Sequence, residues 1–242
     1  KFEVNVVDRP ELVPGGNAIG VKLNTKGVLV VAVTDVIGID GQRYNPAKDA
    51  GIKPGDSILK INDVEVKDAQ HVVKLLNQFK DQTIRIEIDR NNIKYEIETN
   101  PVKSMQDNCY RLGIWVRDKT AGIGTLTFYD KNSKIFGALG HGITDMDTGH
   151  LLNAKYGKII NAKISNIEQG KKGSPGEIKG MFYETEMELG EIINNSQYGI
   201  FGILTDEFVN LNDGKPITIG FKEEVKKGKA YILATVKDNK VE

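Results

Sequence analysis

The sequence of 242 residues is poor in several features that define particular classes of protein. It has one cysteine, Cys109, so it cannot form an internal disulfide, which weakly favours a reducing compartment. No apolar run approaches the roughly 20 residues that a membrane-spanning helix needs. Lysine plus arginine and aspartate plus glutamate number 33 each, and this balanced charge argues against nucleic acid as the main partner.

The chain also lacks an initiating methionine, since it begins at Lys1. We therefore expect a processed or engineered piece, for which a missing export or anchor segment carries no information. The composition, with 39% hydrophobic and 27% charged residues, is ordinary for a globular protein. The length fits one large domain or two modest ones.

The first 15 residues combine strand-like alternation with turn residues. Phe2, Val4 and Val6 alternate as in a strand, and two prolines then interrupt the pattern. We expect residues 1–15 to form a linker or an edge strand.

Residues 16–102 carry the most specific local pattern in the chain. A β-branched run at 28–33 predicts a strand that is buried on both faces, and Asp68 can cap a helix that follows it. Between them, the string AGIKPGDSILKINDVEV contains a corner with glycines, a strand and a tight turn. A hairpin follows, with strands over 83–89 and 93–99.

This order of elements and the sequence AGIKPGDSILKINDVEV resemble those of the PDZ domains of bacterial proteases. The resemblance implies that an apolar-glycine-apolar loop offers backbone N–H groups to a ligand's C-terminal carboxylate, and that the ligand adds a strand to the sheet. The matching peptide-binding residues are Ile19, Gly20 and Val21, and His71 at the start of the helix would flank the groove. In the alternative interpretation, Gly20 only relieves a bend and His71 is an ordinary surface histidine.

Residues 103–242 have a different sequence pattern. Pro101 and Val102 mark the boundary between the two predicted domains. Short β-like runs alternate with turns that contain glycine, and few stretches could be helical. This pattern predicts a β-barrel or a sandwich. The fold class expected for the whole chain is therefore mainly β with minor α.

A Gly-His-Gly corner around His141 follows an apolar, strand-like run. The flanking glycines expose the imidazole, and a histidine at a strand end is a natural general base. The same segment contains Asp145, Asp147 and His150, so a divalent metal shared with His141 stays open as an alternative. The spacing matches no known metal motif, however, and fits a polar turn equally well, so we expect no metal and no other cofactor.

Ser174 lies in the string Lys-Gly-Ser-Pro-Gly, which is similar to the nucleophile corner of serine proteases. Two lysines precede it in place of a glycine-rich turn, and Pro175 removes the N–H group directly after the serine. We therefore interpret this segment as an exposed loop.

Three strings together resemble the sporulation stage IV B peptidase family of spore-forming Firmicutes: PGGNAIGVKLNTKGVLVVAV, GIKPGDSILKIN and, above all, FGALGHGITDMDTG. The resemblance covers essentially the whole chain. It implies a serine endopeptidase with a PDZ domain (16–102) followed by part of a trypsin-like β-barrel (103–242), and it carries the family's histidine base onto His141. The family's serine string, similar to Gly-Met-Ser-Gly-Ser-Pro, does not occur, so we expect this chain to lack the nucleophile and the aspartate and to be inactive.

The resemblance also implies what such a peptidase acts on and where. These peptidases cleave themselves and a regulator of a membrane-embedded protease, which releases an active sigma factor. They are exported from the forespore into the space between the two membranes around it, and the full-length protein is expected to be membrane-associated through a further N-terminal segment.

Polypeptides are the partners expected from this resemblance. The PDZ groove would take protein or peptide substrates or the protein's own termini, and an incomplete barrel would favour dimerisation by strand exchange. The alternative function is that of a non-enzymatic PDZ adaptor with a β-rich partner domain.

Overall fold

The computed structural model describes residues 8–182, 187–237 and 240–241. Strands contain 51% of the residues and helices 11%, which confirms the prediction of a mainly β fold with minor α. The chain divides into two compact units. We call them the barrel unit (1–22, 121–143 and 157–242) and the PDZ-like unit (23–120 and 144–156).

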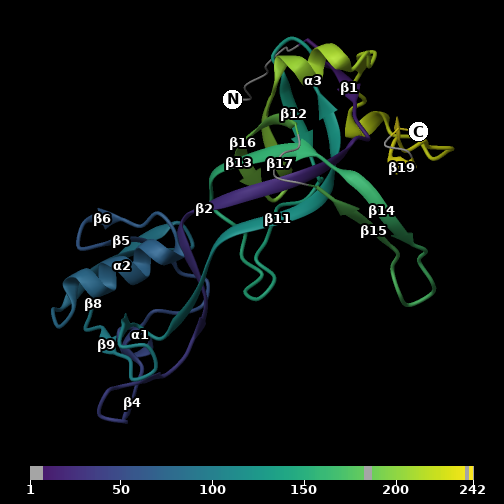
Figure 1. The fold of residues 1–242 in the computed structure, drawn as a ribbon. Coiled ribbons are helices and arrows are strands. Elements are labelled where there is room, and N and C mark those ends of the chain that lie inside the picture. Colours follow the sequence, from purple (N-terminus) through teal and green to yellow (C-terminus); the bar gives the residue numbers. More distant parts are fainter. Residues whose placement is uncertain (1–7, 183–186, 238–239, 242) are drawn as a thin grey trace. The chain divides into compact units, whose positions relative to one another are not determined.

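The PDZ-like unit contains a sheet that packs against one long helix (Figure 1). Its elements are β3 (Val36–Ile37), β4 (Arg43–Tyr44), α1 (Pro46–Asp49), β5 (Ser57–Ile61), β6 (Val64–Glu65), α2 (Ala69–Phe79), β7 (Ile84–Arg90), β8 (Ile93–Thr99), β9 (Val102–Lys103) and β10 (Tyr110–Arg111). The apolar stripe of α2 and the alternating isoleucines of β7 share one buried core, as their periodicities of 3.6 and 2 residues predict.

Local sequence explains where these elements begin and turn. The side chain of Asp68 accepts a hydrogen bond from the N–H of His71 at 2.8 Å and so caps α2. Between β7 and β8, Asn91 and Asn92 have φ angles of 53° and 64°, the left-handed pair that a two-residue hairpin turn requires. The cap and the hairpin agree with the sequence prediction, but β7 extends to Arg90 and the turn has two residues, one fewer than predicted.

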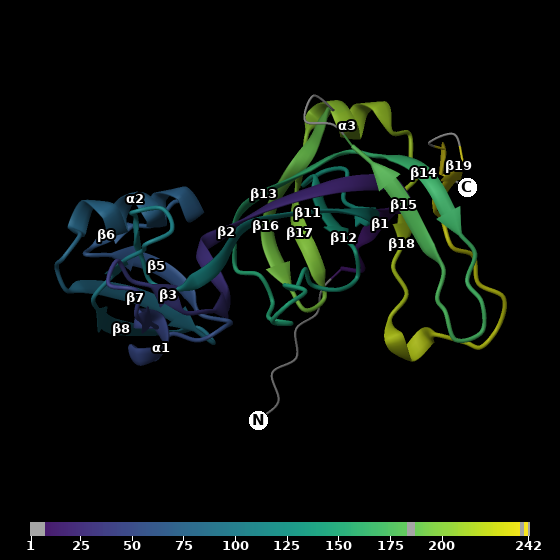
Figure 2. The same ribbon diagram turned by 60° about the horizontal axis from the view of Figure 1, so that its bottom comes forward.

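The barrel unit is a closed sheet with a short helix and a projecting hairpin. Its elements are β1 (Glu11–Pro14), β12 (Ile135–Ala138), β14 (Lys163–Glu168), β15 (Glu177–Met181), β16 (Glu188–Ser196), β17 (Gly199–Leu204), α3 (Asp206–Leu211), β18 (Ile217–Thr218), the 3-10 turn η1 (Lys222–Glu224), β19 (Thr235–Lys237) and β20 (Lys240–Val241). Figures 1 and 2 both show β14 and β15 extending beyond the closed sheet.

Three further strands contribute residues to both units: β2 (Ala18–Val33), β11 (Ile114–Tyr129) and β13 (Ala154–Asn161). Pairing follows the path β2-β13-β16-β17-β12-β11, and β11 pairs again with β2. At the barrel end of this contact, the N–H of Leu126 donates to the carbonyl oxygen of Asn17 at 3.0 Å. The sheet of the barrel unit is therefore closed, and of the two architectures expected for this half it is the barrel.

The units are interleaved along the chain, whereas the sequence predicted the consecutive segments 1–15, 16–102 and 103–242. Residues up to Lys22 belong to the barrel unit, and 103–120 belong to the PDZ-like unit. The reason is the length of β2 and β11, because each of these 16-residue strands supplies both units. Of the first segment, Phe2, Val4 and Val6 lie outside the described residues, and the rest contains β1, which pairs with β11 and β18.

Candidate functional site

His141 follows β12 on a corner whose backbone conformation is unusual. Leu139 and Gly140 are both left-handed, with φ angles of 73° and 78°. This region disfavours a leucine by about 1–3 kcal/mol. The Leu139 side chain packs over Gly124, where a Cβ atom would lie 2.0 Å from Leu139 Cδ2. Enforced strain of this kind clusters at functional sites, and here it accompanies an exposed His141 side chain.

The imidazole of His141 contacts the next residue in the chain. Its Nδ1 lies 3.0 Å from the carbonyl oxygen of Gly142. A proton on Nδ1 would be donated to this carbonyl, and that tautomer leaves the Nε2 lone pair free. The corner therefore suits a general base that accepts a proton at Nε2.

Asn195, on β16, holds the backbone just beyond the histidine. Its Oδ1 accepts the N–H of Ile143 at 2.8 Å, and its Nδ2 donates to the Ile143 carbonyl at 2.9 Å. Asn195 is 8% exposed, so both bonds are shielded from water. Gly199, the first residue of β17, packs so closely that a Cβ atom there would lie 2.5 Å from the Ala138 carbonyl oxygen. Sequence reasoning missed Asn195, because no local pattern marks an asparagine 52 residues from the loop that it holds.

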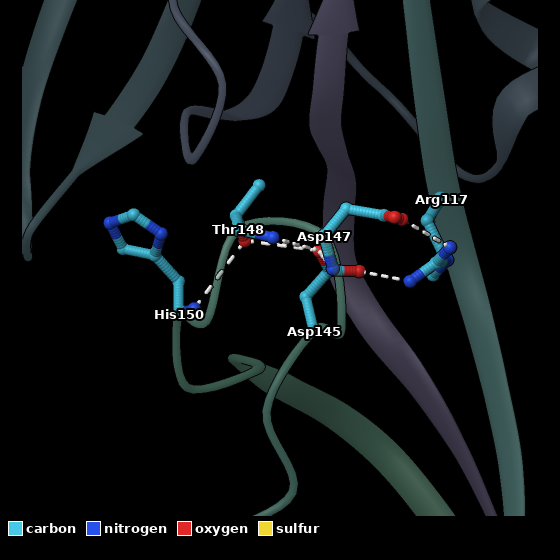
Figure 3. A network of polar contacts seen from close by, with 5 residues as sticks. All are labelled: Arg117, Asp145, Asp147, Thr148 and His150. Carbon is cyan, nitrogen blue, oxygen red and sulfur yellow. Dashed lines mark hydrogen bonds and ion pairs between the residues drawn. The ribbon is translucent and has the colours of Figure 1, made fainter.

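A polar cluster in the PDZ-like unit fixes the segment that follows (Figure 3). Asp145 is 1% exposed, and its Oδ1 accepts hydrogen bonds from the N–H of Thr148 at 2.9 Å and of Asp147 at 3.1 Å. Its other oxygen forms an ion pair with Arg117 of β11. The second arm of the Arg117 guanidinium binds Asp147 at 2.8 Å. Arg117 therefore clasps two carboxylates of one loop, and we call this the Arg117 clasp.

Burial acts to raise the pKa of Asp145, but the hydrogen bonds from Thr148 and the charge of Arg117 outweigh it, so that the pKa lies below its usual value. The carboxylate is therefore ionised at neutral pH and matched by a guanidinium.

The metal alternative placed His141, Asp145, Asp147 and His150 around one ion. In the structure both carboxylates bind Arg117, and the His150 ring lies over Gly55, where a Cβ atom would be 2.7 Å from His150 Cε1. Among the described residues, no group of three or more His, Cys, Asp or Glu side chains is arranged to hold a metal ion.

The structure places the predicted peptide-binding residues Ile19, Gly20 and Val21 inside β2, in the barrel unit. Ile19 is fully buried and Val21 is 3% exposed. A Cβ atom on Gly20 would lie 2.7 Å from the ring of Phe182. These residues thus form the interior of a paired strand and not a loop that presents N–H groups, since the strand extends further than the local pattern indicates.

His71 lies near the start of α2 as predicted, but it serves the helix cap. Its N–H donates to Asp68, and its Nδ1 accepts the N–H of Lys67 at 3.3 Å. It is half-buried, and it does not line the groove described next.

A groove of about 450 Å³ runs along α2 within the PDZ-like unit. One wall is the apolar face of the helix, with Ala69, Val72, Val73 and Leu76. The opposite side includes the segment from Arg111 to Val116, where β11 begins. β11 pairs with β1 and β12 only through residues 126–129, near its C-terminal end. Among the described strands, β2 is the one that remains to pair with the start of β11, so the other edge of this part of the strand is unpaired. An unpaired strand edge beside a helix is the geometry that accepts a peptide strand.

The end of this groove has the chemistry of a carboxylate site. Gly113 has a φ angle of 73°, and the carbonyls of Leu112 and Gly113 accept the N–H groups of Ala47 at 3.0 Å and Thr34 at 2.8 Å. In the described part of the chain, the N–H groups of Leu112 and Gly113 have no protein acceptor. Two donors beside an apolar groove suit a peptide's terminal carboxylate. The signal was present in the sequence, because Leu112-Gly113-Ile114 repeats the apolar-glycine-apolar pattern of residues 19–21.

Ser174 lies in the exposed turn between β14 and β15. The N–H and carbonyl groups of Ser174 bond those of Lys171 at 2.9 and 2.8 Å, which closes a tight reverse turn. Its hydroxyl has no hydrogen-bond partner among the described residues, so nothing there would act as its base.

Comparison with known proteins gives two matches to family models. A model described as SpoIVB peptidase S55 matches residues 108–242, and a PDZ domain model matches residues 18–100. The groove is thus completed by residues 111–116, which lie beyond the end of the PDZ match.

One similar curated protein is "Putative zinc metalloprotease LL2128" of Lactococcus lactis subsp. lactis, which is 30% identical over 102 residues. The match covers 42% of this chain and 22% of that protein, so the chain spans about a fifth of this relative's length. In the described residues, no helix has both the length and the apolar character that crossing a membrane requires.

Proposed function

The chain belongs to the SpoIVB peptidase S55 family, and from this premise we propose that it is part of a serine endopeptidase in which His141 is the general base. The observation that carries the proposal is the strained corner at His141, where Nδ1 of the imidazole lies by a carbonyl and where Asn195 holds the backbone of Ile143, two residues further on. In the reaction, Nε2 accepts the proton of the nucleophilic serine and later returns it to the leaving amine.

The nucleophile is not assigned to a serine of these 242 residues. The family's serine string does not occur in the sequence, and Ser174 lies in a turn without a base. We therefore propose that this chain alone binds polypeptides without cleaving them, and that another part of the natural gene product supplies the rest of the triad.

Substrates, partners and location are proposed from the family. The peptidase cleaves itself and a regulator of a membrane-embedded protease, and so contributes to sigma-factor activation during sporulation. It acts in the space between the two forespore membranes, associated with a membrane before processing, and the barrel unit pairs with a second copy by strand exchange.

An active-site probe tests the peptidase assignment. The natural gene product should react covalently with a fluorophosphonate, and the Ser174→Ala variant should react equally, because Ser174 has no base. Intact-protein mass spectrometry measures the labelled fraction. An unlabelled natural protein would exclude a serine peptidase, and loss of label in Ser174→Ala alone would make that serine the nucleophile.

A second function, peptide binding, is favoured by the groove along α2. We propose that it takes the C-terminal end of a polypeptide, with the carboxylate on the N–H groups of Leu112 and Gly113 and an apolar last side chain against the helix. This activity does not depend on catalysis, and it is what a non-enzymatic adaptor would retain.

Gly113→Ala should weaken binding of a peptide with a free C-terminus by about 10- to 100-fold, which is the loss of charge-assisted hydrogen bonds worth about 1.5–3 kcal/mol. The new Cβ atom would lie 2.1 Å from the Thr34 carbonyl oxygen, so the loop must move. Trp115 is the only tryptophan and lines the groove, so its fluorescence reports docking.

Gly51→Ala is the matched control, because Gly51 has a φ angle of 80° and nothing within 4 Å of its Cβ position. An amidated peptide should bind the unaltered protein as weakly as the free peptide binds Gly113→Ala. Equal binding of amidated and free peptides would move the carboxylate site elsewhere.

A further inference from the structure

The turn between β16 and β17 lies against the corner that carries the proposed general base. Gly199 follows the tip of this turn and begins β17. A Cβ atom on Gly199 would lie 2.5 Å from the carbonyl oxygen of Ala138 and 3.2 Å from the amide nitrogen of Gly140. The turn therefore adjoins the backbone directly before His141, and both belong to the barrel unit.

This turn presents Tyr198 to solvent and is itself held in one conformation. The hydroxyl of Ser196 donates to the carbonyl oxygen of Gly199 at 3.2 Å and accepts the N–H of Tyr198 at 3.2 Å. Tyr198 is nevertheless 72% exposed. Tyrosine has only two side-chain torsions to fix, so on a rigid turn its ring can contact another polypeptide at a low cost in conformational entropy.

The segments that meet at this place lack the residues that are charged at neutral pH. Neither 135–143 nor 192–205 contains Asp, Glu, Lys or Arg, although these four types make up 27% of the chain. Large apolar side chains are exposed on the same strands: Ile193 is 65% exposed, and Ile135 and Ile203, which pair between β12 and β17, are 50% and 45% exposed. Such a surface favours an uncharged, apolar occupant, because a charged side chain placed on it would lose hydration without gaining an ionic partner from these segments.

The continuity of this surface with the corner at His141 indicates its occupant. A general base acts only within hydrogen-bond reach of the reacting group, so the substrate residues beside the scissile bond must cross the surface around His141. We propose that Tyr198 is a specificity-determining residue, which packs against an apolar or aromatic side chain of the substrate next to the scissile bond. The inference rests on the proposed peptidase function and adds to it the class of substrate residue that the site prefers.

The experiment profiles the natural gene product on a mixture of peptides digested from a cell proteome, in which mass spectrometry identifies the residues on both sides of every cleaved bond. At one position within two residues of that bond, the unaltered peptidase should prefer aromatic and large aliphatic residues over Asp and Glu by about 10-fold, the lower end of what an apolar contact contributes to discrimination. In Tyr198→Ala this preference should fall below about 3-fold, because only part of the apolar contact remains. The preferences at the other positions should stay unchanged.

Tyr198→Phe should retain the preference within about 2-fold, because the ring and not the hydroxyl makes the proposed contact. Tyr231→Ala is the matched control, since Tyr231 is 91% exposed in the same unit and its loss should leave the profile unchanged. An undiminished preference in Tyr198→Ala, or an equal change in Tyr231→Ala, would overturn the proposal.

Fluorophosphonate labelling separates the possible failures. It requires an activated serine but no extended substrate, so Tyr198→Ala should be labelled as fast as the unaltered protein. Loss of labelling in Tyr198→Ala would show that the ring supports the structure of the site, and it would overturn the proposed contact with substrate. An unlabelled natural protein would refute the peptidase assignment and this inference with it, whereas normal labelling with a profile that does not depend on Tyr198 would refute this inference alone.

Discussion

Replacement of His141 by alanine is expected to lower kcat of the natural peptidase by about 10⁴-fold or more, with KM changed far less. The serine would lose the group that accepts its proton, while the residues that bind the substrate stay in place. Cleavage of a polypeptide substrate, followed over time by mass spectrometry, measures the loss. Reaction with a fluorophosphonate should fall in parallel, because that reaction also requires an activated serine.

His71→Ala is the matched control for this variant. His71 is a second histidine on the same chain, but it serves the cap of α2 through Asp68 and Lys67. Its loss should leave kcat within about 2-fold, since His71 contacts the cap of α2 and not the corner at His141. Full activity in His141→Ala would refute the assignment of the base, and an equal loss in both variants would indicate general destabilisation.

Features determined by neighbouring residues could be predicted from the sequence. The cap at Asp68 and the turn at Asn91-Asn92 depend on side chains and backbone within three or four residues. The corner at His141 is also local, because flanking glycines mark a position where the backbone departs from a strand. The exposed loop at Ser174 follows in the same way from the residues around it.

Features that depend on distant pairing could not be predicted. Arg117 and Asp145 are 28 residues apart, and Asn195 and Ile143 are 52 residues apart, so only the folded chain brings them together. The carboxylate loop is a different case. The apolar-glycine-apolar pattern occurs at 19–21 and at 112–114, and only the position of α2 distinguishes the copy that lies beside the groove.

The same distinction explains why each compact unit of the structure combines segments that are not consecutive in the chain. Hydrophobic pattern and turns locate a strand, but they do not say which neighbours pair along each part of a 16-residue strand. In β11 the residues that line the groove, the clasp residue Arg117 and the barrel residues that pair with β12 are consecutive parts of one element.

Asn195→Leu is expected to destabilise the protein by about 2–4 kcal/mol, because the N–H and carbonyl of Ile143 would lose two shielded partners at once. Leucine has the same number of side-chain heavy atoms and the same branch at Cγ, so the change removes the hydrogen bonds and keeps the shape of the side chain. In the natural peptidase kcat should also fall, by about 100-fold, since a small displacement of a catalytic group carries a cost of this size. Urea denaturation measures the first effect and substrate cleavage the second.

Asn194→Leu provides the control, because Asn194 is the exposed neighbour of Asn195 on β16 and its loss should change stability by less than about 0.5 kcal/mol. Asn195→Asp separates the two bonds. It keeps the acceptor for the Ile143 N–H but loses the donor to the carbonyl, so its stability and kcat should lie between those of the unaltered protein and Asn195→Leu. A leucine variant with unchanged stability and activity would show that the backbone conformation of Leu139 and Gly140 maintains the corner at His141 without the hydrogen bonds of Asn195.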